Sequence, residues 1–235
     1  MPKYLIADFV VEYDPKYDNL TELSKPFLYY GDRTADICMN KTAEQIENLL
    51  SRMVAGSTLG EAEELAYASE FNRRIINHSA MLVHSSAILV GGSAYLFSAD
   101  SGVGKSTHTR LWKQLYGDEV AYINDDKPVV RIKDGIATAY GTPFDGGSKI
   151  ANNVSAPLGG IIFLERGEEN SISQITSTSQ ILQRLYFSTA HFVNKKTADS
   201  MLNNFEELIA NTVFYKLICN MGPDSAKIAH DFLIG

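Results

Sequence analysis

The apolar and polar positions in the first third of the chain predict a small segment of strands and helices. Apolar runs at residues 4–12 and 35–39 are typical of strands. A Thr-Ala-Glu-Gln capping sequence with apolar residues at helical spacing predicts a helix over residues 42–53, and a stretch rich in Ala and Glu predicts another over residues 59–76. Because no internal repeat and no long Pro- or Ser-rich linker follows, we expect residues 1–77 to pack on the rest of the chain.

Beyond this segment the pattern changes to short strands joined by tight turns. Residues 81–90 and 94–98 are separated by Gly-Gly, and residues 128–133 and 136–140 by Asp-Gly, a strong signal of a type I′ turn. Each pair therefore predicts a β-hairpin. The strand at residues 94–98 should run antiparallel to the strand that precedes it.

The remaining pattern completes an α/β fold. It predicts helices at residues 180–187, 198–210 and 225–233. It predicts strands at residues 160–164 and 213–219. Hairpins next to helices favour a mixed, partly antiparallel sheet with flanking helices over an all-parallel, doubly wound sheet. We therefore expect residues 78–235 to form one domain and residues 1–77 a small α+β segment.

Composition and charge exclude some classes of partner and location. The 235 residues include 21 Lys and Arg against 28 Asp and Glu, a formal net charge of −7, so we expect neither nucleic acid nor an anionic membrane as partner. The N-terminus lacks the pattern of a signal peptide, and the most apolar window, residues 80–90, is too short to cross a bilayer. Cys38 and Cys219 lie in apolar runs, which predicts two buried thiols in a reducing compartment, the cytoplasm.

The segment that carries chemistry is a Gly-containing loop between a predicted strand and a predicted helix. Its sequence from residue 99 is Ala-Asp-Ser-Gly-Val-Gly-Lys-Ser, and the helix should run from Ser106 to about Tyr116. Glycines let consecutive N–H groups point at phosphate oxygens, and the helix N-terminus adds its positive dipole end. The residues predicted to contact nucleotide phosphates are Ser101, Gly102, Val103, Gly104, Lys105, Ser106 and Thr107. The first glycine of the usual pattern is replaced by Ala99, and the alternative is an ordinary surface turn.

An acidic pair follows the next predicted strand. Residues 120–123 are apolar and lead into Asn-Asp-Asp-Lys, which contains Asp125 and Asp126. Two adjacent carboxylates at the end of a buried strand repel each other unless a cation lies between or beside them. A divalent metal that also contacts nucleotide phosphates would supply this cation. The alternative is a polar turn between two strands.

Two histidines lie close to these motifs in the sequence. His84 interrupts the apolar run of residues 81–90, and a histidine in such a strand is more often a core residue than a catalyst. His108 follows Ser106 on the first turn of the predicted loop helix. This position allows an approach to the nucleotide, but we expect His108 to pack on the sheet.

These motifs together resemble the catalytic domain of the bacterial HPr kinase/phosphorylase family, which shares its fold and phosphate-loop setting with the ATP-dependent phosphoenolpyruvate carboxykinases. The resemblance is carried by His84 and its apolar strand, by the loop at residues 99–106 and by Asp125-Asp126, within about residues 79–164. The shorter HPr-kinase-related proteins match further, in Ser-Thr-His after the loop lysine and in Asn-Asp-Asp-Lys-Pro on the acidic strand.

The resemblance implies a division of roles in phosphoryl transfer from ATP or another purine nucleotide. Lys105 would hold the β- and γ-phosphates, and Ser106 and Asp126 would ligate Mg²⁺. Asp125 would accept the proton of the acceptor hydroxyl, and His84 would lie beside Asp125 and tune it. Catalysis of this kind depends mainly on positioning and charge neutralisation.

The chain also departs from the family. Residues 1–77 are much shorter than the family's N-terminal domain, and the Arg-Gly loop is replaced by residues 140–149, which lack Arg. HPr as substrate and the reverse, phosphorolytic reaction are therefore not expected. Lys149 either replaces the missing positive charge or is a solvated loop lysine.

These observations leave three functions open. The first is a kinase that phosphorylates serine in a small protein or peptide. The second is a kinase for a small hydroxylated metabolite such as free serine, and the third is a non-catalytic nucleotide-binding sensor or scaffold. A carboxykinase is disfavoured because the chain is short and lacks an Arg-rich patch for a dianionic substrate. A homo-oligomer is compatible with the sequence.

Overall fold

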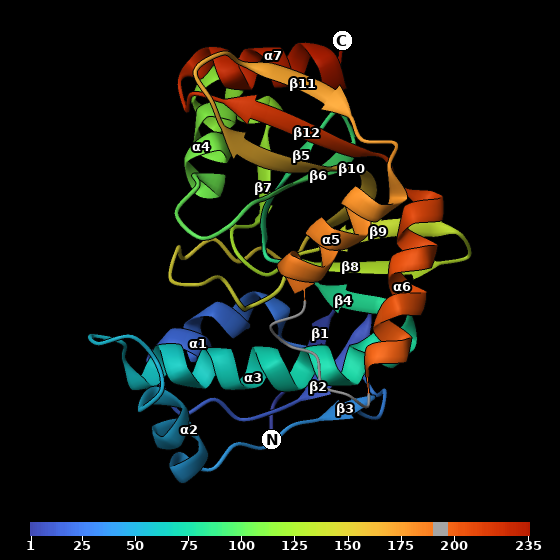
Figure 1. The fold of residues 1–235 in the computed structure, drawn as a ribbon. Coiled ribbons are helices and arrows are strands. Elements are labelled where there is room, and N and C mark those ends of the chain that lie inside the picture. Colours follow the sequence, from blue (N-terminus) through green and yellow to red (C-terminus); the bar gives the residue numbers. More distant parts are fainter. Residues whose placement is uncertain (190–196) are drawn as a thin grey trace.

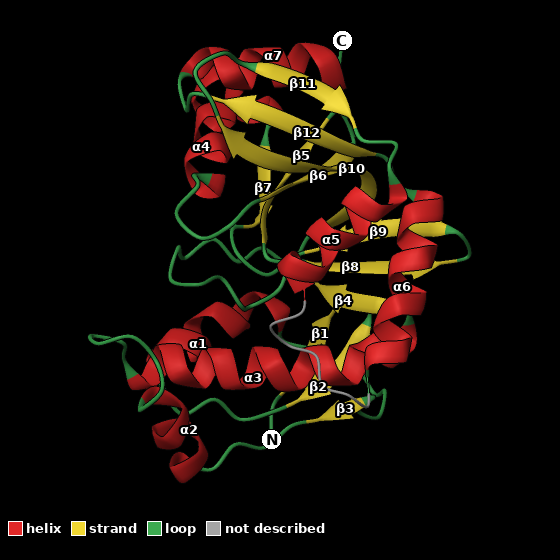
Figure 2. Cartoon of the chain, in the orientation of Figure 1, coloured by secondary structure: helices red, strands yellow, loops and turns green. Residues whose placement is uncertain are grey.

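The computed structural model describes residues 1–189 and 197–235 (Figure 1, Figure 2). Its N-terminal part holds a three-stranded sheet with the order β1-β2-β3, together with three α-helices and two 3₁₀ turns. These elements are β1 (Lys3–Ile6), β2 (Phe9–Glu12), α1 (Asp18–Ser24), η1 (Lys25–Phe27), β3 (Ile37–Cys38), α2 (Ala43–Leu50), α3 (Leu59–Ile75) and η2 (Ile76–His78). The predicted helices after Thr42 and Thr58 both begin with a complete capping box.

The rest of the described chain forms a nine-stranded mixed sheet with flanking helices. Its elements are β4 (Ala80–Leu82), β5 (Ser85–Val90), β6 (Ser93–Ser98), α4 (Lys105–Tyr116), η3 (Gly117–Glu119), β7 (Ala121–Asn124), β8 (Val129–Lys133), β9 (Ile136–Tyr140), β10 (Ser155–Arg166), β11 (Ser171–Gln174), α5 (Thr178–Thr189), α6 (Ala198–Asn211), β12 (Phe214–Cys219) and α7 (Pro223–Leu233). The predicted fold class, α/β with a mixed and partly antiparallel sheet, is confirmed, as are the hairpins β5–β6 and β8–β9.

Strand directions bring several chain segments to one edge of this sheet. β6, β10 and β12 are parallel, and β5 is antiparallel to both β6 and β7. The carboxyl ends of β6, β7, β10 and β12 therefore lie at the same edge as the first residue of β5. In open α/β sheets this edge is where ligands bind.

The long strand β10 makes the sheet curl. Its first residues pair with β9, and its last residues pair with β6 and β12. The register shifts between Leu158 and Gly160, where a Cβ at Gly160 would lie 2.7 Å from the ring of Tyr215. Glycine at this position lets the neighbouring strand approach while β10 bends.

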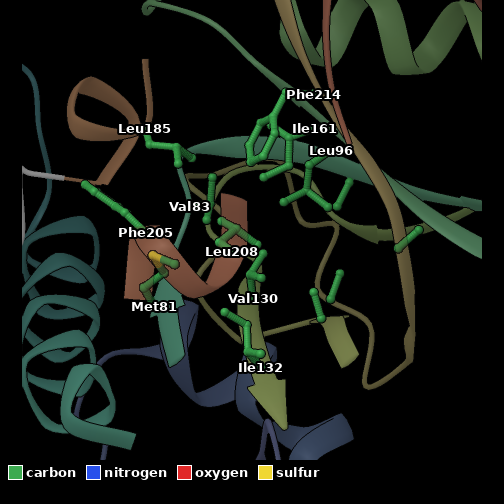
Figure 3. Packing of buried hydrophobic residues seen from close by; sticks show 14 of the residues in the cluster. Met81, Val83, Leu96, Val130, Ile132, Ile161, Leu185, Phe205, Leu208 and Phe214 are labelled. Atoms are coloured by element: carbon green, nitrogen blue, oxygen red, sulfur yellow. The ribbon is translucent and has the colours of Figure 1, made fainter. Parts of the chain in front are cut away.

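Different helices pack on different strands of the sheet. α4 contacts β5 and β6, and α7 contacts α4 and β11, whereas α6 contacts β4, β8 and β9 (Figure 1). Under α6, Met81, Val130 and Phe205 belong to one buried cluster and converge from β4, β8 and α6 (Figure 3). Trp112 of α4 lies in a second buried cluster.

The N-terminal part packs on the large sheet through a shared hydrophobic cluster. Phe71 of α3 lies in the same cluster as Leu82, Val129 and Phe144. Asn72 accepts a hydrogen bond of 2.7 Å from the backbone N–H of Leu82. Residues 1–77 therefore pack on the large sheet at β4 and at the start of β8.

Some expectations were wrong in detail. The strand predicted over residues 4–12 is a hairpin, because Ala7 and Asp8 have φ values of 51° and 66°. The strand predicted over residues 81–90 is interrupted at Val83 and His84. Cys38 is exposed, since on the short edge strand β3 it alternates with the buried Ile37, whereas Cys219 is buried as expected. In the described residues no helix has the length and apolar character needed to span a membrane.

Candidate active site

The predicted phosphate loop connects β6 to α4 at the carboxyl edge of the sheet. Gly102 and Gly104 have φ values of 79° and 123°, and Gly104 caps the helix that begins at Lys105. The N–H groups in the first turn of a helix have no acceptor within the helix. Together with the helix dipole they provide donors suited to phosphate oxygens. Of the predicted phosphate-binding residues, Ser101, Gly102 and Thr107 are exposed, and Val103, Gly104 and Ser106 are half-buried.

Two residues outside the motif support the loop. The guanidinium of Arg166, at the end of β10, donates hydrogen bonds of 2.7 Å to the carbonyl of Gly102 and 3.2 Å to that of Val103. On the other side a Cβ at Gly104 would lie 2.2 Å from Cε of Met221. Neither residue was predicted from the sequence. The one signal for Arg166 is its place in the charged Glu-Arg pair that follows the apolar run of β10.

Lys105 lies under the loop. Its Nζ donates a hydrogen bond of 3.0 Å to the carbonyl of Ala99, and the residue is buried. Burial lowers the pKa of this ammonium, and the negative charges of Asp126, Asp100 and Asp125 oppose the shift. The charged end of the side chain is therefore at the Ala99 end of the loop, within the field of both carboxylates of the acidic pair.

Asp125 is buried and is linked to the loop helix. Its Oδ1 accepts a hydrogen bond of 2.5 Å from Ser86 Oγ, which lies 2.8 Å from Thr109 Oγ1. Thr109 Oγ1 in turn lies 3.2 Å from the carbonyl of Ser106. Ser86 was not predicted, although a serine within an apolar strand is a recognisable signal for a buried polar contact.

Asp126 contacts two basic side chains. Its Oδ1 lies 3.2 Å from Nε2 of His84, and its Oδ2 pairs with Lys127. Burial by itself raises the pKa of this carboxyl, but the hydrogen bond from His84 and the charge of Lys127 outweigh burial, so the pKa lies well below its usual range.

The expected contact between His84 and Asp125 was therefore wrong. β5 and β7 are antiparallel, and Ala87 pairs with Asn124. Because the strands are antiparallel, the residue after Asn124, Asp125, lies beside the residue before Ala87, Ser86. The next residue, Asp126, then lies toward His84. The strand register thus gives each carboxylate a different partner: Ser86 for Asp125 and His84 for Asp126.

Asn124 fixes the acidic turn. Its Oδ1 accepts hydrogen bonds of 2.9 and 2.6 Å from the N–H groups of Asp126 and Lys127, and its Nδ2 donates bonds of 3.0 and 3.1 Å to the carbonyls of Thr142 and Phe144. Asn124 is fully buried. The turn is therefore a built structure with satisfied hydrogen bonds, unlike a solvated polar turn.

The N-terminal part of the chain also contacts the residues around the acidic turn. Glu64 of α3 accepts hydrogen bonds of 3.0 and 2.9 Å from the N–H groups of Asp145 and Gly146 and lies 3.8 Å from Lys127 Nζ. A Cβ at Gly146 would lie 2.5 Å from Asp126 Oδ2. Burial raises the pKa values of Glu64 and Asp145. These residues were missed because nothing local in the sequence joins them.

The other two residues singled out in the sequence take different positions. Lys149 is exposed, with a φ value of 60°. His108 is fully buried: its Nε2 accepts a hydrogen bond of 3.1 Å from Trp112, and its ring centroid lies 4.9 Å from that of Phe97 on β6. Its packing on the sheet is as predicted.

A cleft of about 720 Å³ opens beside the loop. Its walls come from the end of β6 and the first loop residues, from the end of β10 and from α5. His84 lines it, as do Asp100, Glu165 and Arg184. The cleft therefore extends from the Ala99 end of the loop, where the charged end of Lys105 lies.

The residues present suit a metal that is held partly by phosphate. In residues 1–189 and 197–235 no group of three or more His, Cys, Asp and Glu residues could hold a metal ion alone. Hydroxyl and carboxylate oxygens, as in Ser106 and Asp126, are the ligands that Mg²⁺ uses next to nucleotide phosphates. An ion here would need the oxygens of a bound nucleotide to complete its coordination.

Several solved structures are similar to this chain, and one of them is an HPr kinase. The HPr(Ser) kinase/phosphatase from Coxiella burnetii has a TM-score of 0.39 to this chain and 8% sequence identity, and the match covers 65% of this chain and 95% of that chain. No family model matches the sequence, and no curated protein matches it.

Proposed function

We propose that this protein is a Mg²⁺-dependent kinase that transfers the γ-phosphate of ATP, or of another purine nucleotide, to a hydroxyl group. The observation that carries the proposal is the position of Lys105. Its ammonium lies under a loop suited to phosphate and interacts with the charges of Asp125 and Asp126. A phosphate loop, a lysine and two carboxylates at one sheet edge are the parts that phosphoryl transfer requires.

The contacts of the two carboxylates favour different roles. Asp126 faces two basic groups that keep it charged, which suits a metal ligand together with Ser106. Asp125 faces the neutral hydroxyl of Ser86, which suits a group that must accept a proton. When bound, Mg²⁺ would neutralise phosphate charge. In the transfer, the acceptor oxygen forms a bond to the γ-phosphorus, the bond to the β-phosphate oxygen breaks, and the hydroxyl proton passes to Asp125.

The resemblance specifies that the acceptor carries a hydroxyl group but not which molecule it is. A serine in a small protein or peptide is the first candidate, and a small metabolite such as free serine is the second. The second is favoured by one observation, a cleft at the Ala99 end of the loop that contains both a carboxylate and a guanidinium.

Nucleotide binding and turnover test the proposal. Calorimetric titration with ATP and GTP, with Mg²⁺ and with EDTA, should show binding that Mg²⁺ strengthens. Incubation with γ-labelled nucleotide and serine-containing acceptors should move the label to an acceptor. Absence of nucleotide binding would refute the assignment of the loop. Binding without label transfer to any acceptor and without hydrolysis would instead favour the non-catalytic sensor or scaffold.

A further inference from the structure

The cleft lies where an acceptor would meet the terminal phosphate. This inference rests on the proposed kinase function. The loop lysine reaches the β- and γ-phosphates in a site of this kind, and Lys105 Nζ lies at the carbonyl of Ala99. Ala99 and His84 both line the cleft. The space therefore opens from the γ-phosphate end of the predicted nucleotide site.

The side chains that line the cleft carry equal numbers of negative and positive charges. Among the described residues that line it, Asp100 and Glu165 are acidic, and Arg166 and Arg184 are basic. Arg166 is committed to the carbonyls of the phosphate loop. A phosphorylated or otherwise polyanionic acceptor would need an excess of positive charge, which these side chains do not provide.

One ion pair in the cleft remains for recognition. Arg184 of α5 pairs with Glu165 of β10, and its guanidinium carbon lies 5.4 Å from the centroid of the Phe163 ring. The side chains of Arg184 and Glu165 are 28% and 39% exposed. A partly exposed pair of this kind contributes little to stability. Opening it to admit a ligand with two opposite charges therefore costs little.

We propose that the acceptor is a free hydroxyl-bearing α-amino acid, bound as its zwitterion. Its carboxylate would pair with Arg184, whose planar guanidinium binds carboxylates in a bidentate manner. Its ammonium would pair with Glu165, and its side-chain hydroxyl would point toward the Ala99 end of the loop. A serine inside a peptide has neither charge on its backbone. It would leave Arg184 and Glu165 paired with each other and gain nothing from them.

Blocked and free acceptors test this assignment. The protein would be incubated with Mg·ATP and either L-serine or N-acetyl-L-serine amide, and phosphorylated products would be measured by mass spectrometry and ³¹P NMR. We expect O-phospho-L-serine from the free amino acid and a kcat/KM at least 10²-fold lower for the blocked compound. Equal use of both compounds, or use of serine only within peptides, would overturn the proposal.

Variants of the ion pair separate the acceptor site from the nucleotide site. Arg184→Gln and Glu165→Gln should each raise the KM for L-serine at least 10-fold while the Kd of Mg·ATP changes less than twofold. Lys227→Gln breaks a more exposed ion pair, with Asp224 on α7, outside the cleft and should change neither value. An unchanged KM in both cleft variants would overturn the proposal. Failure to bind Mg·ATP in the unaltered protein would instead refute the kinase function itself.

Discussion

Nε2 of His84 lies 3.2 Å from Oδ1 of Asp126, while the neighbouring carboxylate, Asp125, is bound by the hydroxyl of Ser86. The antiparallel register of β5 and β7 produces this separation. In the proposed site His84 therefore orients Asp126, and the first expectation, that it tunes Asp125, is replaced. The two carboxylates should respond differently to substitution.

Asp125→Asn should abolish phosphoryl transfer, because an amide cannot accept the acceptor proton, while the Kd of the nucleotide changes little. Asp126→Asn should instead raise the Mg²⁺ concentration for half-maximal activity. Since partners of metal ligands typically affect metal affinity 10- to 100-fold, His84→Ala should resemble Asp126→Asn, with a rise of about 10-fold. Steady-state rates as a function of Mg²⁺ check this. If His84→Ala lowers kcat at saturating Mg²⁺ without shifting the Mg²⁺ dependence, the metal-side role of His84 is wrong.

Lys105→Ala should weaken Mg·ATP binding by about 10- to 100-fold, because a charge-assisted hydrogen bond contributes roughly 1.5–3 kcal/mol. Arg110→Ala is the matched control, since Arg110 is an exposed cation on the same helix. Calorimetry on both variants measures the difference. Equal affinities in the two variants would show that the loop does not bind nucleotide through this lysine.

Local sequence signals explain which parts of the fold could be predicted. The Thr-x-x-Gln and Thr-x-x-Glu capping boxes fix the starts of α2 and α3, and the Asp-Gly turn of β8–β9 has φ values of 52° and 76°. The hairpin β1–β2 was missed because its left-handed turn is formed by Ala7 and Asp8, without glycine. Such a turn depends on tertiary packing that the local pattern does not encode.

The candidate site likewise has parts that the local sequence predicts and parts that it does not. The phosphate loop and the acidic pair are contiguous in sequence, so their residue types predict their chemistry. Ser86, Arg166 and Glu64 reach the same region from β5, β10 and α3, and their contacts depend on strand order and register. A single sequence does not provide that register, which is also why His84 was paired with the wrong carboxylate.

Asn124→Ala should destabilise the fold by roughly 3 kcal/mol, because it leaves several buried backbone groups of the acidic turn and of the 142–144 loop without their partner. Asn153→Ala is the control, since Asn153 is exposed and donates a single hydrogen bond to the carbonyl of Pro26. Urea denaturation of both variants measures the two changes. A loss below 1 kcal/mol for Asn124→Ala would contradict the role assigned to this residue.

His108 couples stability to pH. The residue is fully buried, and burial lowers the pKa of its imidazole to about 4, against an ordinary value near 6.5. The unfolded chain therefore binds a proton between these two pH values when the folded chain does not. By linkage, the free energy of unfolding is unaffected well above pH 6.5 and falls as the pH drops from 6.5 toward 4.

The loss expected from His108 between pH 8 and pH 5 is about 2 kcal/mol, since one pKa unit corresponds to about 1.4 kcal/mol. His108→Gln removes the titration but keeps an acceptor for the Trp112 N–H, which the imidazole Nε2 accepts at 3.1 Å in the native protein. The variant should therefore lose much less stability over the same pH range, whatever its stability at pH 8. Urea denaturation of both proteins at several pH values measures the two slopes. Parallel slopes would mean that His108 is protonated in the folded protein as readily as in the unfolded chain.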